Sequence, residues 1–103
     1  MLALSSPSFI VTRGVTRPVW EPNAGTMALY ETARALAQLI GGDLPGEMRG
    51  GGSDCNFTGR MGIPSLDDLG PTGAGYHTLN EHIDIASLPQ RGRLVAGLLA
   101  TLE

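Results

Sequence analysis

The apolar side chains between residues 24 and 40 recur every three or four positions. This spacing predicts a helix with one buried face. Asn23 stands where a side chain can cap the first turn, and Gly41 and Gly42 stand where the backbone can leave the helix. The apolar positions of this face are Met27, Leu29, Tyr30, Ala33, Leu36, Ala37 and Ile40.

A second stripe of apolar positions, in residues 88–102, predicts a C-terminal helix. Ser87 is the expected N-cap, and Pro89 falls in the first turn, where its missing amide hydrogen costs little. Between the two long helices, residues 55–61 can form a short helix capped by Ser53.

Residues 8–19 are rich in β-branched and aromatic side chains, which predicts one or two short strands. Shorter strands are expected within 44–49 and 63–66, whereas the glycine-rich residues 70–76 are expected to form a loop without regular structure. Strands that alternate with helices predict an α/β fold, with a partial mixed or parallel sheet and flanking helices. Such a sheet needs cover on both faces and several strands, so we expect this one to be part of a larger sheet.

Composition and charge narrow the function classes. With 103 residues the chain is one domain or less, and 42% apolar residues are enough for a core. A net charge of −3 argues against nucleic acid or an anionic membrane surface as partner, because both need a basic face. No apolar stretch approaches the roughly 20 residues that span a bilayer, and the N-terminus lacks a secretory signal. We therefore expect a soluble, cytoplasmic protein.

His77 is a candidate metal ligand. It follows the segment Gly-Ala-Gly-Tyr, whose small residues let an imidazole approach a metal ion. One histidine is not a zinc site, because a catalytic zinc takes about three protein ligands, and the residue chemistry alone favours a solvated loop histidine. His82 is expected at the surface, while Glu81 and Asp84 are either ligands, partners of a ligand, or exposed charges.

The run Gly50-Gly51-Gly52 is a candidate anion site together with Ser53 and Asp54. Glycines let the backbone approach a ligand, and free amides at the start of a following helix favour an anion. The Lys-Ser/Thr pair of a phosphate-binding loop is missing, so a carboxylate fits better than a polyphosphate. The competing interpretation is a flexible turn with Ser53 as a cap. Arg17, at the end of a predicted strand, is either a clamp for a carboxylate or a solvated side chain. Cys55 is expected to be a buried structural thiol.

Three stretches resemble, in the same order, the dizinc metallopeptidase family of glutamate carboxypeptidase, acetylornithine deacetylase, succinyl-diaminopimelate desuccinylase and aminoacylase. They are residues 17–22 (RPVWEP), 50–58 (GGGSDCNFT) and 62–77 (GIPSLDDLGPTGAGYH). The ending, residues 81–102, is also similar. The resemblance therefore covers nearly all of the chain after its first dozen or so residues.

This resemblance implies a catalytic domain with a central sheet, interrupted by a lid domain that usually mediates dimerisation. Residues 1–20 would be a remnant of the lid domain and the crossover strand, and residues 21–103 the C-terminal part of the catalytic domain. His77 would be the last zinc ligand, and Arg17 would hold the free carboxylate of the substrate. The other residues implied to line the substrate site are Gly52, Ser53, Asp54 and Gly75.

The intact enzyme would bind two zinc ions and hydrolyse the amide bond of an N-acyl amino acid or peptide, through a metal-bound hydroxide. The remaining ligands and the general-base glutamate would lie in an N-terminal part outside this sequence. We therefore expect the chain to bind zinc weakly and to be inactive alone. Its expected partner is a second copy in a homodimer or that N-terminal part.

Two other function classes stay open at this point. The chain can be a non-catalytic interaction module, or a degenerate remnant, that assembles with another chain. It can also be a small anion-binding domain built on the glycine run.

Overall fold

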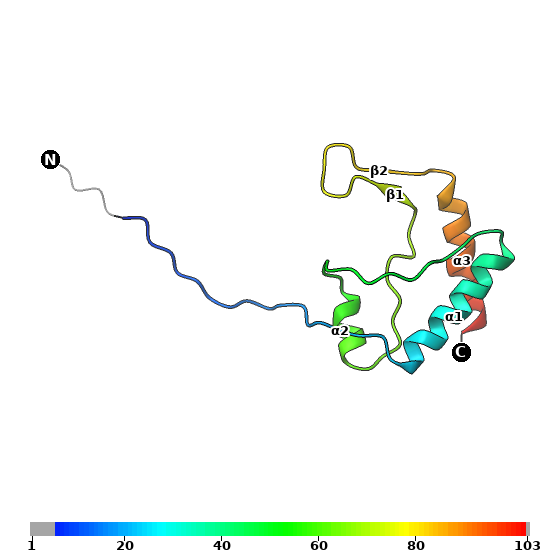
Figure 1. The fold of residues 1–103 in the computed structure, drawn as a ribbon, viewed down its shortest axis with the longest axis horizontal. Helices are drawn as coiled ribbons and strands as arrows, with labels where there is room; N and C mark the ends of the chain where they lie inside the picture. The colour runs from blue at the N-terminus through cyan, green and yellow to red at the C-terminus, as the bar shows by residue number, and fades with distance from the viewer. Residues whose placement is uncertain (1–5, 103) are drawn as a thin grey trace.

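The computed structural model describes residues 6–102 and is mostly helical, with one small sheet (Figure 1). In chain order the elements are α1 (Ala24–Leu39), α2 (Cys55–Arg60), β1 (Gly73–Ala74), β2 (His82–Ile83) and α3 (Ser87–Thr101). The strands β1 and β2 form an antiparallel hairpin in which Gly73 faces Ile83. Long extended connections join the helices.

Helix α1 confirms the prediction from its apolar spacing. The Asn23 side chain accepts a hydrogen bond from the Thr26 amide at 2.8 Å, which satisfies one of the free amides of the first turn. The helix ends at Leu39, and Gly41 adopts a φ of +82°, a backbone conformation that favours glycine.

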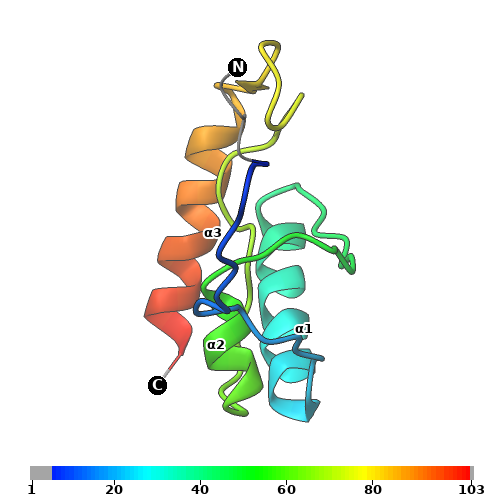
Figure 2. The same ribbon diagram turned by 90° about the vertical axis from the view of Figure 1, so that its left-hand side faces the viewer.

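The core lies where α1 and α3 pack side by side in opposite directions (Figures 1 and 2). The small side chains of Ala33 and Ala37 on α1 allow α3 to come close. The Tyr30 hydroxyl donates a hydrogen bond to the Leu44 carbonyl at 2.7 Å, which attaches the connection after α1 to the core. The predicted stripe of α3 is only partly covered, because Leu99 is 77% exposed. The buried apolar residues are Ala33, Ala37, Leu44, Leu94 and Leu98.

The starts of the other two helices are organised by serine side chains. At α2 the predicted cap Ser53 lies one residue before the cap position, which Asp54 occupies without a side-chain bond. The Ser53 hydroxyl accepts a hydrogen bond from the Cys55 amide at 3.2 Å. At α3 the predicted N-cap is wrong, because Ser87 is the first residue of the helix and Ala86 occupies the cap position without a side-chain bond. The buried Ser87 hydroxyl contacts the base of the hairpin instead.

The strands predicted within residues 8–19, 44–49 and 63–66 are not formed. Residues 6–19 are extended but pair with no strand within residues 6–102, and Figure 1 shows this segment leaving the body of the molecule. The observed sheet is antiparallel rather than mixed or parallel, and its strand β1 falls in a segment expected to be irregular. The helical part of the predicted α/β fold is confirmed.

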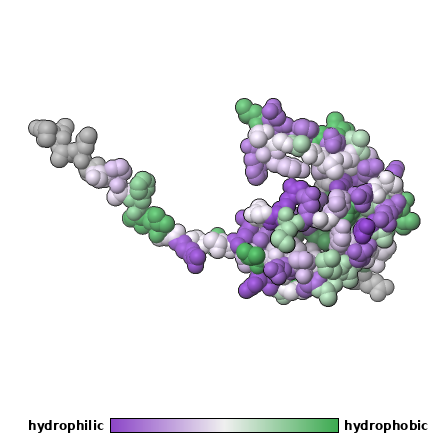
Figure 3. Space-filling view, in the orientation of Figure 1, coloured by the Kyte–Doolittle hydropathy of each residue, from purple (hydrophilic) through white to green (hydrophobic). Residues whose placement is uncertain are grey.

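The extended N-terminal segment sets the overall dimensions. The radius of gyration is 19.8 Å, whereas a compact domain of this length has about 13 Å. Figure 3 shows apolar residues gathered on the segment, where Phe9, Ile10 and Val11 are 85–96% exposed. Across residues 6–102 every helix is too short or too polar to cross a membrane.

Candidate functional site

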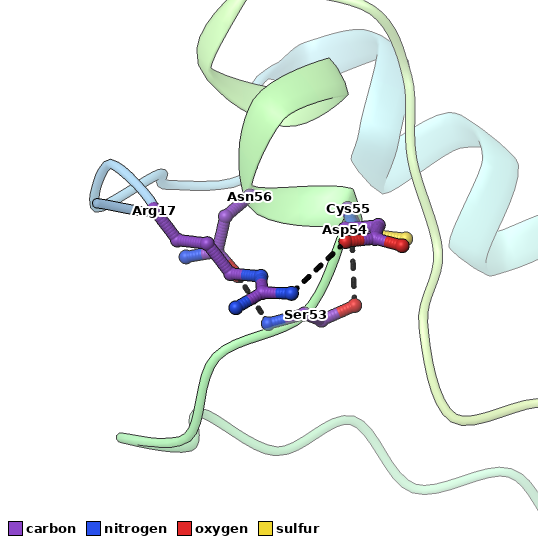
Figure 4. Close-up of polar contacts among 5 residues, drawn as sticks. All are labelled: Arg17, Ser53, Asp54, Cys55 and Asn56. Atoms are coloured by element: carbon purple, nitrogen blue, oxygen red, sulfur yellow. Dashed lines mark hydrogen bonds and ion pairs between the residues drawn. The ribbon is translucent and has the colours of Figure 1, made fainter. Parts of the chain in front are cut away.

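Arg17 and Asp54 lie 37 positions apart in the sequence and meet in space (Figure 4). The guanidinium Nη2 of Arg17 donates to Oδ1 of Asp54 at 3.2 Å. The two side chains are 51% and 93% exposed, so solvent screens the pair and it contributes at most about 1 kcal/mol. The structure thus brings together two residues for which the sequence suggested one site.

Two further contacts attach the segment around Arg17 to α2. The Asn56 side chain donates from Nδ2 to the Pro18 carbonyl at 2.7 Å, and its Oδ1 accepts from the Ser53 amide at 2.9 Å. The indole of Trp20 lies directly on Gly59, where any Cβ would overlap the ring. These contacts fix where the extended segment joins the body.

The glycine run contributes space to this site. A Cβ on Gly52 would lie 3.2 Å from Cδ of Arg17, closer than ordinary van der Waals contact, so the missing side chain gives room to the arginine stem. Beyond accepting from Cys55, the Ser53 hydroxyl makes no other hydrogen bond within residues 6–102. Cys55 is partly buried and its thiol donates to the Leu66 carbonyl at 3.4 Å, in keeping with a structural role.

His77 lies in the loop of the β1–β2 hairpin. Its φ of +63° is uncommon for a residue with a side chain, and its imidazole is exposed and makes no hydrogen bond within the described part of the chain. The turn needs Gly75, which has a φ of +76° and where a Cβ would come within 2.8 Å of the Asn80 carbonyl oxygen. Thr78 closes the turn by donating from its amide and its hydroxyl to the Gly75 carbonyl, at 3.0 and 2.6 Å.

A hydrogen-bond network joins the base of the hairpin to α3. The Asp84 amide donates to the Thr72 carbonyl at 2.7 Å, and the Thr72 hydroxyl donates to Asp84 Oδ2 at 3.1 Å. The Ser87 hydroxyl accepts from the Thr72 amide at 2.9 Å and donates to the Asp84 carbonyl at 2.6 Å. Asp84 therefore has a structural task at the hairpin base.

Two polar residues that follow His77 in the hairpin are exposed. His82 lies at the surface as expected, with its Nδ1 2.8 Å from the Asn80 carbonyl oxygen, and Glu81 is exposed as well. No group of three or more His, Cys, Asp or Glu side chains within residues 6–102 could hold a metal ion. His77 has the right donor chemistry for one zinc ligand, but the described residues do not form a complete metal site.

Asn56 is the residue of this site whose part the sequence did not reveal. It lies within the stretch 50–58, where its side chain gave no sign of a contact with a segment 38 positions earlier. An amide side chain offers both a donor and an acceptor, which is the only hint that it can join two segments.

In Figure 1 the hairpin loop and the glycine run point to the side from which the N-terminal segment departs.

Comparison with known proteins identifies the family. Residues 9–101 match Peptidase family M20/M25/M40. The chain belongs to this family. It is 38% identical over 95 residues to carboxypeptidase G2 from Pseudomonas sp. (strain RS-16), an alignment that covers 90% of the chain and 22% of that enzyme. The chain thus spans about a fifth of the length of this relative. No solved structure gave a significant match.

Membership of this family confirms the resemblance inferred from the motifs. The match includes all three motif stretches, residues 17–22, 50–58 and 62–77, and the C-terminal helix up to residue 101. Members of the family are metallopeptidases that typically depend on zinc and act on peptides.

Proposed function

We propose that this chain supplies part of the substrate site and one zinc ligand of an amidohydrolase that cleaves N-acyl amino acids or peptides with a free carboxylate. The observation that carries the proposal is the meeting of Arg17 with the Ser53–Asp54 segment, inside a chain matched to a peptidase family over residues 9–101. Glutamate-type substrates are the favoured class.

Arg17 is proposed to bind the free carboxylate of the substrate. Asp54 occupies only Nη2 of its guanidinium, and a guanidinium has five N–H donors in a planar fork that suits a carboxylate. The exposure of Arg17 leaves this group accessible from solvent. Gly52 keeps the space beside the arginine stem open, and the hydroxyl of Ser53 offers a further donor.

His77 is proposed to be the zinc ligand. A residue with a side chain in the left-handed region is strained by roughly 1–2 kcal/mol, and such strain concentrates at functional sites. The turn at Gly75 presents the imidazole to solvent without a competing hydrogen bond in residues 6–102. The other ligands of two zinc ions would come from outside the described residues, so the isolated chain is proposed to be inactive.

The domain assignment is proposed on the same grounds. Residues 1–20 would belong to a lid domain and its crossover strand, and residues 21–103 to the catalytic domain. Exposed apolar side chains on residues 9–11 and on the outer face of α3 support a larger fold, because burying such surface stabilises a protein by about 25 cal/mol per Å². The extended segment would then pair with strands of another part of the enzyme or of a second copy. A cytoplasmic location stays a prediction.

An exchange of segments tests the proposal. The 95-residue region of carboxypeptidase G2 that aligns with this chain is replaced by this chain, and the hybrid is assayed with N-acyl glutamates. Activity is expected in the hybrid and not in the 103-residue chain mixed with zinc. Robust turnover by the chain alone would contradict the proposal that the chain supplies only part of the active site.

Two substitutions in the hybrid then test the individual roles. His77→Ala should remove one zinc ion per protein and lower kcat by orders of magnitude, while His82→Ala, its matched control, should leave both unchanged. Arg17→Ala should mainly raise KM if the arginine holds the carboxylate equally in the ground state and the transition state. Unaltered metal content in His77→Ala would refute the ligand role.

If the chain is instead a non-catalytic interaction module or a remnant, the hybrid should fold and bind zinc without turning over any N-acyl amino acid. No contact within residues 6–102 favours a non-catalytic module or a remnant over a part of an enzyme.

A further inference from the structure

Asn56 connects the two chain segments that form the candidate carboxylate site. Its Nδ2 donates to the carbonyl of Pro18, the neighbour of Arg17, at 2.7 Å, and its Oδ1 accepts from the Ser53 amide at 2.9 Å. Asn56 is partly buried, whereas Arg17 and Asp54 are exposed. The donor and the acceptor of one amide group are therefore both used to join residues far apart in the sequence, and Figure 4 shows the contact between Asn56 and Ser53.

We propose that Asn56 is the positioning residue that holds Arg17 beside the glycine run; what Arg17 then binds rests on the function proposed above. The ion pair to Asp54 is too exposed to hold the segment by itself. A partly buried hydrogen bond competes less with water than an exposed ion pair does. The segment before Arg17 adds no support, since residues 9–11 are almost fully exposed, and the packing of Trp20 on Gly59 attaches the chain three residues after Arg17.

The consequence for binding is preorganisation. A guanidinium on a free tail must give up its conformational freedom when it binds a carboxylate, which weakens the affinity. With Pro18 attached to α2 through Asn56, the backbone of Arg17 is placed before the ligand arrives. Removing the attachment should therefore weaken carboxylate binding although Arg17 itself is intact.

The experiment uses ¹⁵N relaxation of the 103-residue chain, with the amides of Arg17 and Val19 and the Arg17 Nε–H as reporters. In the wild type we expect order parameters of about 0.85 for these two amides, and in Asn56→Ala values below about 0.6. Asn56→Asp keeps the acceptor for Ser53 but loses the donor to Pro18, so Arg17 should loosen while the Ser53 amide stays protected from exchange. Asn80→Asp makes the same chemical change at an exposed asparagine and should alter neither reporter.

A titration with free glutamate separates this inference from the proposed function. The Arg17 Nε–H signal should shift in the wild type, with about fivefold weaker binding in Asn56→Ala, the equivalent of one lost hydrogen bond. An absent shift in the wild type, with Arg17 still ordered, would refute the carboxylate site and leave the positioning role standing. Unchanged order parameters in both Asn56 variants would overturn the positioning role.

A wild-type measurement covers the case in which a variant fails to fold. The side-chain amide protons of Asn56 should exchange with solvent more slowly than those of Asn80, because of these two asparagines only Asn56 donates a side-chain amide hydrogen bond within the described residues. Equal exchange rates for the two asparagines would also overturn the inference.

Discussion

Gly59 and Gly92 allow the same substitution in two different surroundings. Both lie inside helices, α2 and α3, where alanine is favoured over glycine by about 0.5–1 kcal/mol. At Gly92 a Cβ would meet nothing within 4 Å, so Gly92→Ala should stabilise the protein by about that amount. At Gly59 the Cβ would overlap the indole of Trp20, and the ring must move away.

The displacement of Trp20 determines how much less stable Gly59→Ala should be than Gly92→Ala. Full burial of an aromatic side chain covers about 150–250 Å², which corresponds to roughly 4–6 kcal/mol at 25 cal/mol per Å². Trp20 is only partly buried and α2 is one of its neighbours, so we expect a loss of about 1–3 kcal/mol. Gly59→Ala should therefore be less stable than Gly92→Ala by roughly this amount, although both gain helix propensity.

Urea unfolding followed by circular dichroism measures the stability, and tryptophan emission reports the displacement directly. Because Trp20 is the only tryptophan, its emission should move to longer wavelength in Gly59→Ala and stay unchanged in Gly92→Ala. Equal stabilisation by the two substitutions, with unchanged emission in both, would show that Trp20 does not pack on α2.

Three further predictions concern the core and the hairpin. Leu94→Ala should cost about 2–5 kcal/mol in urea unfolding, because Leu94 is 2% exposed. Tyr30→Phe should cost about 1–2 kcal/mol in the same assay, since the carbonyl of Leu44 loses its hydrogen bond. Ser87→Ala should cost about 1–3 kcal/mol and should speed hydrogen exchange at the Thr72 amide, which loses its acceptor.

Each of these substitutions has a matched control at an exposed position. Leu99→Ala, Tyr76→Phe and Ser8→Ala should each change stability by less than about 0.5 kcal/mol. If Leu94→Ala lowered the stability no more than Leu99→Ala does, this result would contradict the packing of Leu94 between α3 and α1. Unaltered exchange at the Thr72 amide in Ser87→Ala would refute the link between α3 and the hairpin.

The helices were predictable because their signals are local. The apolar spacing of residues 24–40 and the capping side chain of Asn23 act within a few residues, and α1 forms as they indicate. The predicted strands failed because a strand is stabilised by hydrogen bonds to a second strand, and residues 8–19 find none within residues 6–102. Strand β1 was missed for the converse reason, since its pairing with β2 overrides a glycine-rich sequence.

The sequence by itself determined the family, through three ordered motifs, and with it the candidate roles of His77 and Arg17. Those roles stay predictions, and the sequence could not say which residues lie beside them. Tertiary structure alone decided that Arg17 reaches Asp54 across 37 positions and that Asn56 holds Pro18. The physical reason is that such contacts depend on how the chain folds back on itself, whereas a motif records only which side chains are present.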